Sequence, residues 1–78
     1  MKKVVEIYSK ENCVYCTKAK ALLKEHDPMV LMLDRDFNRE EFFKIFPDAK
    51  SFPQIIISGK HIGGYNEAEK YLLDNSIN

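Results

Sequence analysis

The two cysteines of the chain are separated by two residues, in the segment Cys13-Val14-Tyr15-Cys16. A β-branched run at residues 4–8 precedes this segment, and a helical pattern of alanine, leucine and lysine follows it. At this spacing one helical turn brings two sulfurs within reach of a disulfide, and the free N–H groups of the helix start favour a thiolate. The thiolate is the attacking species in thiol–disulfide exchange. We therefore predict a dithiol redox site with Cys13 as nucleophile and Cys16, which points inward by helical phase, as resolving thiol.

Two other uses of a cysteine pair fit this chain less well. A zinc site needs about four ligands, and the only histidines, His26 and His61, lack ligand-pair spacing. A purely structural disulfide across so short a loop constrains the unfolded chain little. The redox interpretation is favoured over both, and we interpret the two histidines as structural or surface groups.

Length and composition predict one small domain, residues 1–78, with a single core. The formal net charge is zero, which gives no electrostatic case for a nucleic-acid partner. The apolar runs at residues 29–33 and 55–57 are far too short to cross a bilayer, so we expect no membrane association. The basic start lacks the apolar stretch of a signal peptide. We therefore expect a cytoplasmic protein whose cysteines are kept largely reduced.

Hydrophobic periodicity and turn residues predict seven elements in the order β-α-β-α-β-β-α. Their expected ranges are 4–8, 14–26, 29–33, 38–47, 54–57, 61–62, and from residue 66 or 67 to 75. Asp27-Pro28 ends the first helix, and Asn38 with Glu41 forms a capping-box pattern at the second. The Ser58-Gly59 turn makes the last two strands antiparallel, whereas the first two, joined by a helix, are parallel. The expected fold is therefore α/β, a four-stranded mixed sheet flanked by helices.

The same patterns predict which side chains face the core. Helical spacing turns the following residues inward: Cys16, Ala19, Leu22 and Leu23 in the first helix, Phe42, Ile45 and Phe46 in the second, and Ala68, Tyr71 and Leu72 in the last. The continuous apolar run at residues 29–33 predicts a strand that is covered on both faces.

Four ordered segments of the chain together resemble a known family. They are Tyr8-Ser9-Lys10, Cys13-Val14-Tyr15-Cys16, Ser51-Phe52-Pro53-Gln54 and His61-Ile62-Gly63-Gly64. With these segments at these spacings, essentially the whole chain resembles a dithiol glutaredoxin, the small glutathione-dependent member of the thioredoxin fold. The family usually has proline where Val14 stands, and Thr-Val-Pro where this chain has Ser51-Phe52-Pro53.

The resemblance implies a glutathione-dependent oxidoreductase that reduces protein disulfides and glutathione mixed disulfides. Glutathione is then the co-substrate, with no metal and no tightly bound cofactor, and disulfide-containing or glutathionylated proteins are the partners. The resemblance also implies a monomer. Relatives donate hydrogen to ribonucleotide reductase, which is therefore implied as a downstream partner.

A glutathione site follows from the same resemblance. Its expected residues are Lys10, Tyr15, Arg39, Phe52, Pro53, Gly64, Tyr65, Asn66 and Glu67. Lys10 and Arg39 are expected to attract carboxylates, and Tyr15 to wall the groove. As isolated residues, all three are also typical surface side chains.

The remaining members of this expected site are backbone positions and a helix start. A cis Phe52-Pro53 bond would turn the Phe52 backbone toward the extended cysteinyl segment of glutathione, although trans is the commoner geometry for a proline that begins a strand. Beyond Gly64, a free helix N-terminus would bind the γ-glutamyl carboxylate, with Glu67 receiving the amine of glutathione.

Two further functions stay open from the sequence. Some glutaredoxins carry a [2Fe–2S] cluster between two subunits, ligated by the first cysteine and by glutathione. Proline at the second motif position disfavours this in relatives and Val14 stands there instead, yet cluster-transfer relatives usually have a single-cysteine motif. The other alternative is a thioredoxin-like donor reduced by a flavoprotein reductase, but the chain has no tryptophan and so lacks the tryptophan-bearing thioredoxin motif.

Overall fold

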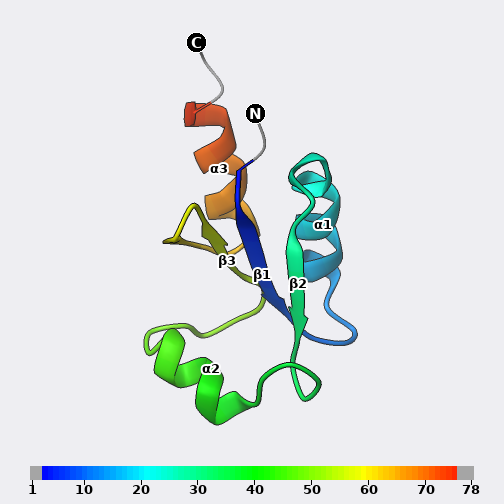
Figure 1. Cartoon of the computed structure of the whole chain (residues 1–78), viewed down its shortest axis with the longest axis vertical. Coiled ribbons are helices and arrows are strands. Elements are labelled where there is room, and N and C mark those ends of the chain that lie inside the picture. Colours follow the sequence, from blue (N-terminus) through cyan, green and yellow to red (C-terminus); the bar gives the residue numbers. More distant parts are fainter. Residues whose placement is uncertain (1–2, 76–78) are drawn as a thin grey trace.

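The computed structural model describes residues 3–75 of the chain. Its elements are β1 (Val5–Ser9), α1 (Val14–Leu22), a short 3₁₀ helix η1 (Lys24–His26), β2 (Met29–Met32), α2 (Arg39–Ile45), β3 (Gln54–Ile57), β4 (Lys60–Gly63) and α3 (Tyr65–Asn75). This is the predicted order β-α-β-α-β-β-α (Figure 1).

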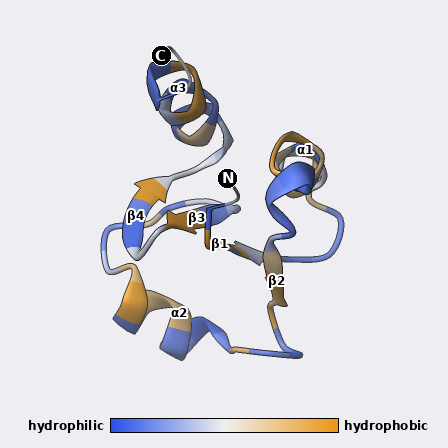
Figure 2. Ribbon diagram, turned by 45° about the horizontal axis from the view of Figure 1, so that its top comes forward, coloured by the Kyte–Doolittle hydropathy of each residue, from blue (hydrophilic) through white to orange (hydrophobic). Residues whose placement is uncertain are grey.

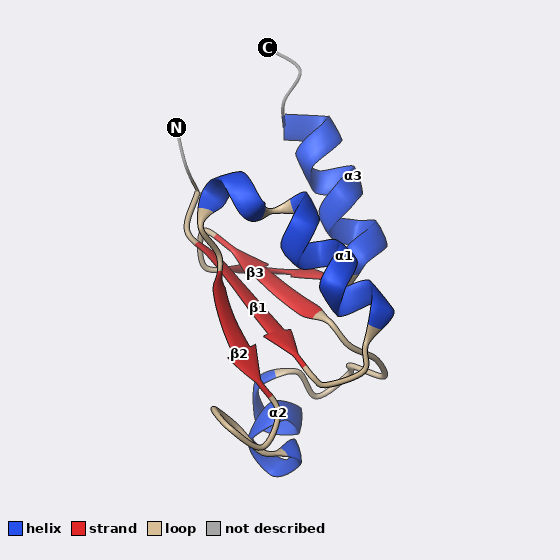
Figure 3. Ribbon diagram, turned by 90° about the vertical axis from the view of Figure 1, so that its right-hand side faces the viewer, coloured by secondary structure: helices blue, strands red, loops and turns tan. Residues whose placement is uncertain are grey.

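The four strands form one mixed sheet in the order β2-β1-β3-β4 (Figure 3). β1 and β2 are parallel, because α1 carries the chain back across the sheet between them, and the other neighbouring strands are antiparallel. Ser58 and Gly59 both have positive φ, 52° and 80°, which is the geometry of a tight hairpin turn between β3 and β4. The predicted four-stranded mixed sheet is confirmed.

Helices cover both faces of the sheet, with α1 and α3 on one face and α2 on the other (Figure 2). Alternation along β1 sends Val5 and Ile7 into the core under α1 and α3, and Tyr8 toward α2. The α2 side holds a cluster of rings that we call the aromatic core: Phe37, Phe42 and Phe46, with Tyr8 and Phe52 packed against them. The aromatic core lies directly behind one of the predicted site segments, the one that contains Phe52.

The capping box predicted for α2 is present, whereas α1 ends earlier than predicted. Asn38 Oδ1 accepts from the Glu41 N–H at 2.8 Å, and Glu41 Oε1 accepts from the Asn38 N–H at 2.9 Å, so the capping box is confirmed. α1 ends at Leu22 and not at His26. The chain tightens there into η1, and Asp27 then turns it with a left-handed φ of 50°.

α3 begins at Tyr65, one residue before the earliest predicted start. Two predictions about which residues are buried, for β2 and for Ile45, were wrong. β2 is an edge strand with no fully buried residue, and Met29 is 59% exposed. β2 is not covered on both faces as predicted, because α1 packs over β1, and α3 packs over β3 and β4. Ile45 is 46% exposed, since the rings of Phe42 and Phe46 fill the narrow contact stripe of the two-turn helix α2.

Candidate active site

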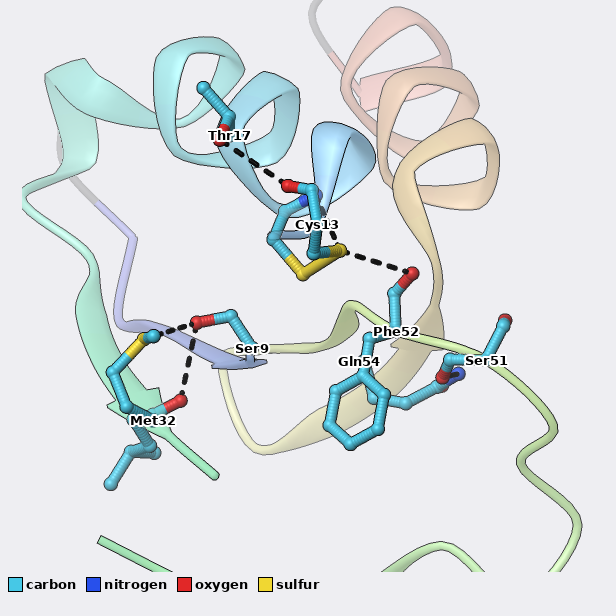
Figure 4. Close-up of a disulfide and its surroundings, with 9 residues drawn as sticks. Ser9, Cys13, Thr17, Met32, Ser51, Phe52 and Gln54 are labelled. Carbon is cyan, nitrogen blue, oxygen red and sulfur yellow. Dashed lines mark hydrogen bonds between the residues drawn. A yellow bond between two sulfur atoms is a disulfide. The ribbon is translucent and has the colours of Figure 1, made fainter. Parts of the chain in front are cut away.

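Cys13 and Cys16 lie where the loop after β1 turns into α1. Cys13 is the N-cap residue of α1, reached through Asn12 in a left-handed conformation with φ of 55°. The two sulfurs form a disulfide, and Cys13 Sγ accepts a hydrogen bond from the Cys16 N–H at 3.2 Å (Figure 4). Cys16 is 1% exposed, whereas Cys13 is only half-buried. A substrate can therefore approach the first sulfur directly, and in the reduced protein the same N–H would stabilise a thiolate there.

The main chain of the segment from Ser51 to Pro53 faces this sulfur. The Phe52–Pro53 peptide bond is cis, and the Phe52 carbonyl oxygen lies 3.8 Å from Cys13 Sγ (Figure 4). The Pro53 side chain is fully buried. The structure therefore places the Phe52 main chain beside Cys13 Sγ.

The Phe52 ring points away from the disulfide into the aromatic core (Figure 4). It stacks on the Phe42 ring, with centroids 4.5 Å apart and planes inclined by 20°. Lys10 Nζ lies 5.7 Å from the centroid of the Phe52 ring, within the range of a cation–π contact. The ring of Phe52 thus supports the predicted cation of the site while its backbone faces Cys13.

Two surface pockets meet at Lys10. The first, of about 530 Å³, is lined by Lys10, Glu11, Asn12, Cys13, Val14, Thr17, Lys20 and Met32. The second, which we call the basic pocket, has a volume of about 350 Å³ and is lined by Lys10, Arg39, Phe42, Phe43, Lys50, Ser51 and Phe52. The basic pocket contains cations and no carboxylate, and none of its cations forms an ion pair with another residue in the range 3–75. It is therefore suited to an anion, and it brings together the predicted residues Lys10, Arg39 and Phe52.

A second group of predicted residues joins α1 to the start of α3. The rings of Tyr15 and Tyr65 have centroids 5.9 Å apart. Lys18 Nζ lies 5.2 Å from the Tyr15 centroid and 5.7 Å from the Tyr65 centroid, so one cation contacts both rings. Tyr15 is 53% exposed, which leaves its ring available as a wall beside the cysteines.

The start of α3 is partly capped by its own side chain. Glu67 Oε1 accepts from the Gly64 N–H at 2.9 Å, so the carboxylate predicted to meet a ligand amine is already bound within the chain. Gly64 borders the cis-proline loop, because a Cβ at this position would lie 3.5 Å from the Pro53 carbonyl oxygen. Asn66 is exposed on the first turn of the helix. Roles for Asn66 and Glu67 in binding a ligand stay predictions.

Three residues of these surfaces were not predicted from the sequence: Lys18, Phe43 and Lys50. Lys50 immediately precedes the Ser51-Phe52-Pro53 segment, and Lys18 follows Tyr15 at helical spacing, so both positions offered a signal. Phe43 offered none, because only the fold shows that it lines a pocket while its neighbour Phe42 is buried.

Among residues 3–75, three side chains have shifted pKa values, and none of them lines the basic pocket. Burial, and then the charge of Glu6, raises the pKa of Tyr8, so its phenol stays neutral. Hydrogen bonds from the Arg35 side chain and the Met32 N–H hold the pKa of Asp36 below its ordinary 3.8. The same Arg35 hydrogen bond and the charge of Asp36 raise the pKa of Arg35.

The described part of the chain contains neither a candidate metal site nor a candidate membrane-spanning helix. No group of three His, Cys, Asp or Glu side chains in residues 3–75 could hold a metal ion. No helix in that range has the length and apolar character needed to cross a membrane.

A four-stranded mixed sheet, a Cys-x-x-Cys pair at the start of its first helix and a cis-proline loop facing that pair define the class of thioredoxin-fold dithiol proteins. The family model described as Glutaredoxin matches residues 5–62. The chain is 44% identical over 73 residues to Glutaredoxin 3 of Escherichia coli strain K12, covering 90% of this chain and 84% of that protein. It is 33% identical over 69 residues to Glutaredoxin-C4 of Arabidopsis thaliana, covering 81% of this chain and 50% of that protein. The chain belongs to the glutaredoxin family.

Solved structures show the same fold. Glutaredoxin 1 from Francisella tularensis, in complex with cacodylate, superposes with a TM-score of 0.76 at 27% identity, over 96% of each chain. A buckwheat glutaredoxin–glutathione complex superposes with a TM-score of 0.75 at 23% identity, over 96% of this chain and 73% of that one. The general function of the family is glutathione-dependent thiol–disulfide oxidoreduction, and in this chain Cys13 and Cys16 form the disulfide of a Cys-x-x-Cys pair.

Proposed function

We propose that the chain is a dithiol glutathione-disulfide oxidoreductase that reduces glutathione mixed disulfides and protein disulfides through Cys13 and Cys16. One observation carries the proposal: a half-buried N-cap sulfur lies 3.8 Å from a main-chain carbonyl, that of Phe52, in a loop that borders the basic pocket. An extended peptide that pairs with the Phe52 main chain would bring its own disulfide to Cys13.

Glutathione fits the proposed groove through its two carboxylates. Lys10 and Arg39 would bind one of them in the basic pocket, and Lys50 adds a third positive charge there. The free N–H groups at the start of α3, beginning with Tyr65, would bind the other. Tyr15 would close the groove between these two ends, supported by its contact with the Tyr65 ring.

Reduction of a glutathione mixed disulfide needs one cysteine of the pair. The Cys13 thiolate attacks the glutathione sulfur, a new Cys13–glutathione disulfide forms, and the substrate sulfur leaves as a thiolate that takes up a proton. A second glutathione thiolate then attacks this intermediate, which releases oxidised glutathione and regenerates the Cys13 thiolate. One glutathione thiol enters the cycle and the other half of oxidised glutathione comes from the mixed disulfide, so the reaction is a pair of thiol–disulfide exchanges and includes no bound cofactor.

Reduction of a protein disulfide uses both cysteines. Cys13 first forms a mixed disulfide with one substrate sulfur and releases the other. Cys16 then loses its proton and attacks Cys13 Sγ, which frees the second substrate thiol and leaves the Cys13–Cys16 disulfide that the structure contains. Two glutathione molecules reduce this disulfide and become oxidised glutathione.

We include in the proposal a cytoplasmic monomer with ribonucleotide reductase as one protein substrate, on the strength of the family resemblance.

Two single-cysteine variants test the proposal. Cys13→Ser should lose all glutathione-dependent activity, because the more accessible of the two sulfurs is the one that attacks. Cys16→Ser should keep reduction of a glutathione mixed disulfide and lose reduction of a protein disulfide, since only the second reaction needs a resolving thiol. Activity is measured by coupling formation of oxidised glutathione to glutathione reductase, beside a parallel assay with thioredoxin reductase. Equal loss of mixed-disulfide reduction in both variants would overturn the assignment.

A further inference from the structure

The Gln54 side chain is buried behind the cis-proline loop, although it takes no part in the cycle above. It is 6% exposed and begins β3. Its Nε2 donates to the Ser51 carbonyl at 2.9 Å, and both residues are drawn in Figure 4. Its Oε1 lies 2.7 Å from His61 Nε2 on β4. Because an amide oxygen only accepts, His61 Nε2 carries the proton and donates it.

The Ser51 carbonyl sets the orientation of this buried amide, and the His61 ring faces the amide oxygen. The His61 ring packs against Phe46 of the aromatic core, with centroids 4.6 Å apart, which holds its Nε2–H toward Gln54. Rotating the amide by half a turn would set its oxygen against the Ser51 carbonyl oxygen, and both atoms can only accept. That contact would be repulsive, so a single orientation of the buried Gln54 amide is favoured, while Ser51 and His61 themselves are exposed.

We propose that Gln54 and His61 are positioning residues, which hold the Ser51–Phe52 main chain in register with Cys13. The inference rests on the proposed function, because register matters only if a substrate pairs with this main chain. A loop that is already held in place loses little conformational entropy when the substrate binds, and the substrate therefore binds more tightly. Two hydrogen bonds and one ring contact therefore connect β4 and the aromatic core to the Ser51 carbonyl, one residue before the Phe52 carbonyl that faces Cys13 Sγ.

Gln54→Leu tests the proposal, since leucine keeps most of the volume and removes both hydrogen bonds. We expect kcat/KM for the cysteine–glutathione mixed disulfide to fall about three- to tenfold, the effect of one or two lost hydrogen bonds. Alkylation of reduced Cys13 by iodoacetamide needs no docked peptide, so its rate constant should change by less than about twofold. His61→Phe keeps the ring against Phe46 and removes the donor, so it should lower kcat/KM as well, whereas His61→Gln supplies a new N–H and should lose less.

Asn75→Leu is the matched control. It removes an amide-to-carbonyl hydrogen bond of similar length but on the surface, from Asn75 Nδ2 to the Tyr71 oxygen at 2.7 Å, at the far end of α3. Both rate constants should stay at the wild-type values in this control.

The proposal is wrong if folded Gln54→Leu keeps its full kcat/KM, or if alkylation slows as much as turnover. If Gln54→Leu does not fold, the two His61 variants decide by the same comparison. Failure of the proposed function would show separately, as a wild-type protein without turnover. The hydrogen-exchange rate of the Gln54 side-chain amide, measured by NMR, then decides: slow exchange in wild type that becomes fast in His61→Phe supports the proposal, and fast exchange in both overturns it.

Discussion

Among residues 3–75, Lys10 alone lines both the pocket that contains Cys13 and the basic pocket. The structure pairs it with the Phe52 ring and with no carboxylate among residues 3–75, so its charge stays available to a ligand. This placement gives a physical reason for a lysine three positions before the first cysteine. A lysine on an exposed helix surface would have no comparable role.

Lys10→Gln should therefore lower kcat/KM for a glutathione mixed disulfide by about three- to tenfold at low salt, since a charged hydrogen bond to a carboxylate is lost. The difference should shrink at high salt, because a half-buried charge is still partly screened. Lys44→Gln is the control, since it removes the same charge from an exposed position on α2 outside the basic pocket. Equal losses in the two variants would mean that only net charge matters.

At the scale of elements, the join between β4 and α3 depends on glycine. Gly63 has φ of 125°, and a Cβ there would lie 2.9 Å from Glu67 Cγ, in the side chain that caps α3 through the Gly64 N–H. Gly59, in the hairpin turn, has φ of 80°, and a Cβ at this position would meet no atom within 4 Å. A substitution at Gly59 therefore tests backbone strain alone, whereas one at Gly63 adds a steric clash with the Glu67 side chain.

Gly59→Ala should cost about 1 kcal/mol in the free energy of unfolding, from the positive φ alone. Gly63→Ala should cost about 2 kcal/mol or more, because strain and displacement of Glu67 add together. Urea unfolding followed by circular dichroism measures both. Similar costs at the two positions would show that the Glu67 cap contributes little.

The turn between β2 and α2 is held by hydrogen bonds to the carboxylate of Asp36. Its pKa in the folded protein lies below the ordinary 3.8, because the Arg35 side chain and the Met32 N–H donate to it. A lowered pKa means that the stabilisation is complete above about pH 4 and is lost as the pH falls through the folded value. The contribution is therefore present at neutral pH and absent in strong acid.

Asp36→Asn should be less stable than wild type at pH 7, and the difference in the free energy of unfolding should shrink below about pH 4. Urea titrations from neutral pH into strong acid measure this difference. Asp48→Asn, which changes an exposed carboxylate at the C-terminal side of α2, serves as control. A difference for Asp36→Asn that stays constant with pH would contradict the assignment.

At the scale of the whole molecule, the sheet separates an aliphatic core under α1 and α3 from the aromatic core under α2. The disulfide sits on the helix of the first core, and the Phe52 loop is held by the second. The reacting sulfur and the main chain beside it are therefore positioned from opposite faces of one sheet. Loss of either core should disturb the site.

Phe42→Ala should lower the free energy of unfolding by about 3–5 kcal/mol, a large part of the total for a small domain, because it leaves a cavity against Phe52. Phe43→Ala, its exposed neighbour on the same helix, should cost less than about 1 kcal/mol. Chemical denaturation of both variants provides the comparison. Comparable losses would mean that α2 is held by its outer face rather than by the aromatic core.

The sequence by itself determined what depends on neighbours along the chain. The Cys-x-x-Cys pair, the capping box at Asn38, the hairpin at Ser58 and the order of elements could all be predicted, because caps, turns and periodicity are local properties. The expected site residues around Lys10 and Phe52 came instead from the ordered motifs of a family, and the fold brings them together.

Only the tertiary structure decided which surfaces meet. The position of β2 at the sheet edge, the place of Phe43 in the basic pocket and the contact of Gln54 with His61 and Ser51 were not predictable from local patterns. Each depends on the order in which the strands pair and on which helix covers which face. Hydrophobic patterns show which residues can be buried, but not which partner covers them, because burial of apolar area has no direction. Met29 in β2 and Ile45 in α2 are exposed for this reason, although their patterns predicted burial.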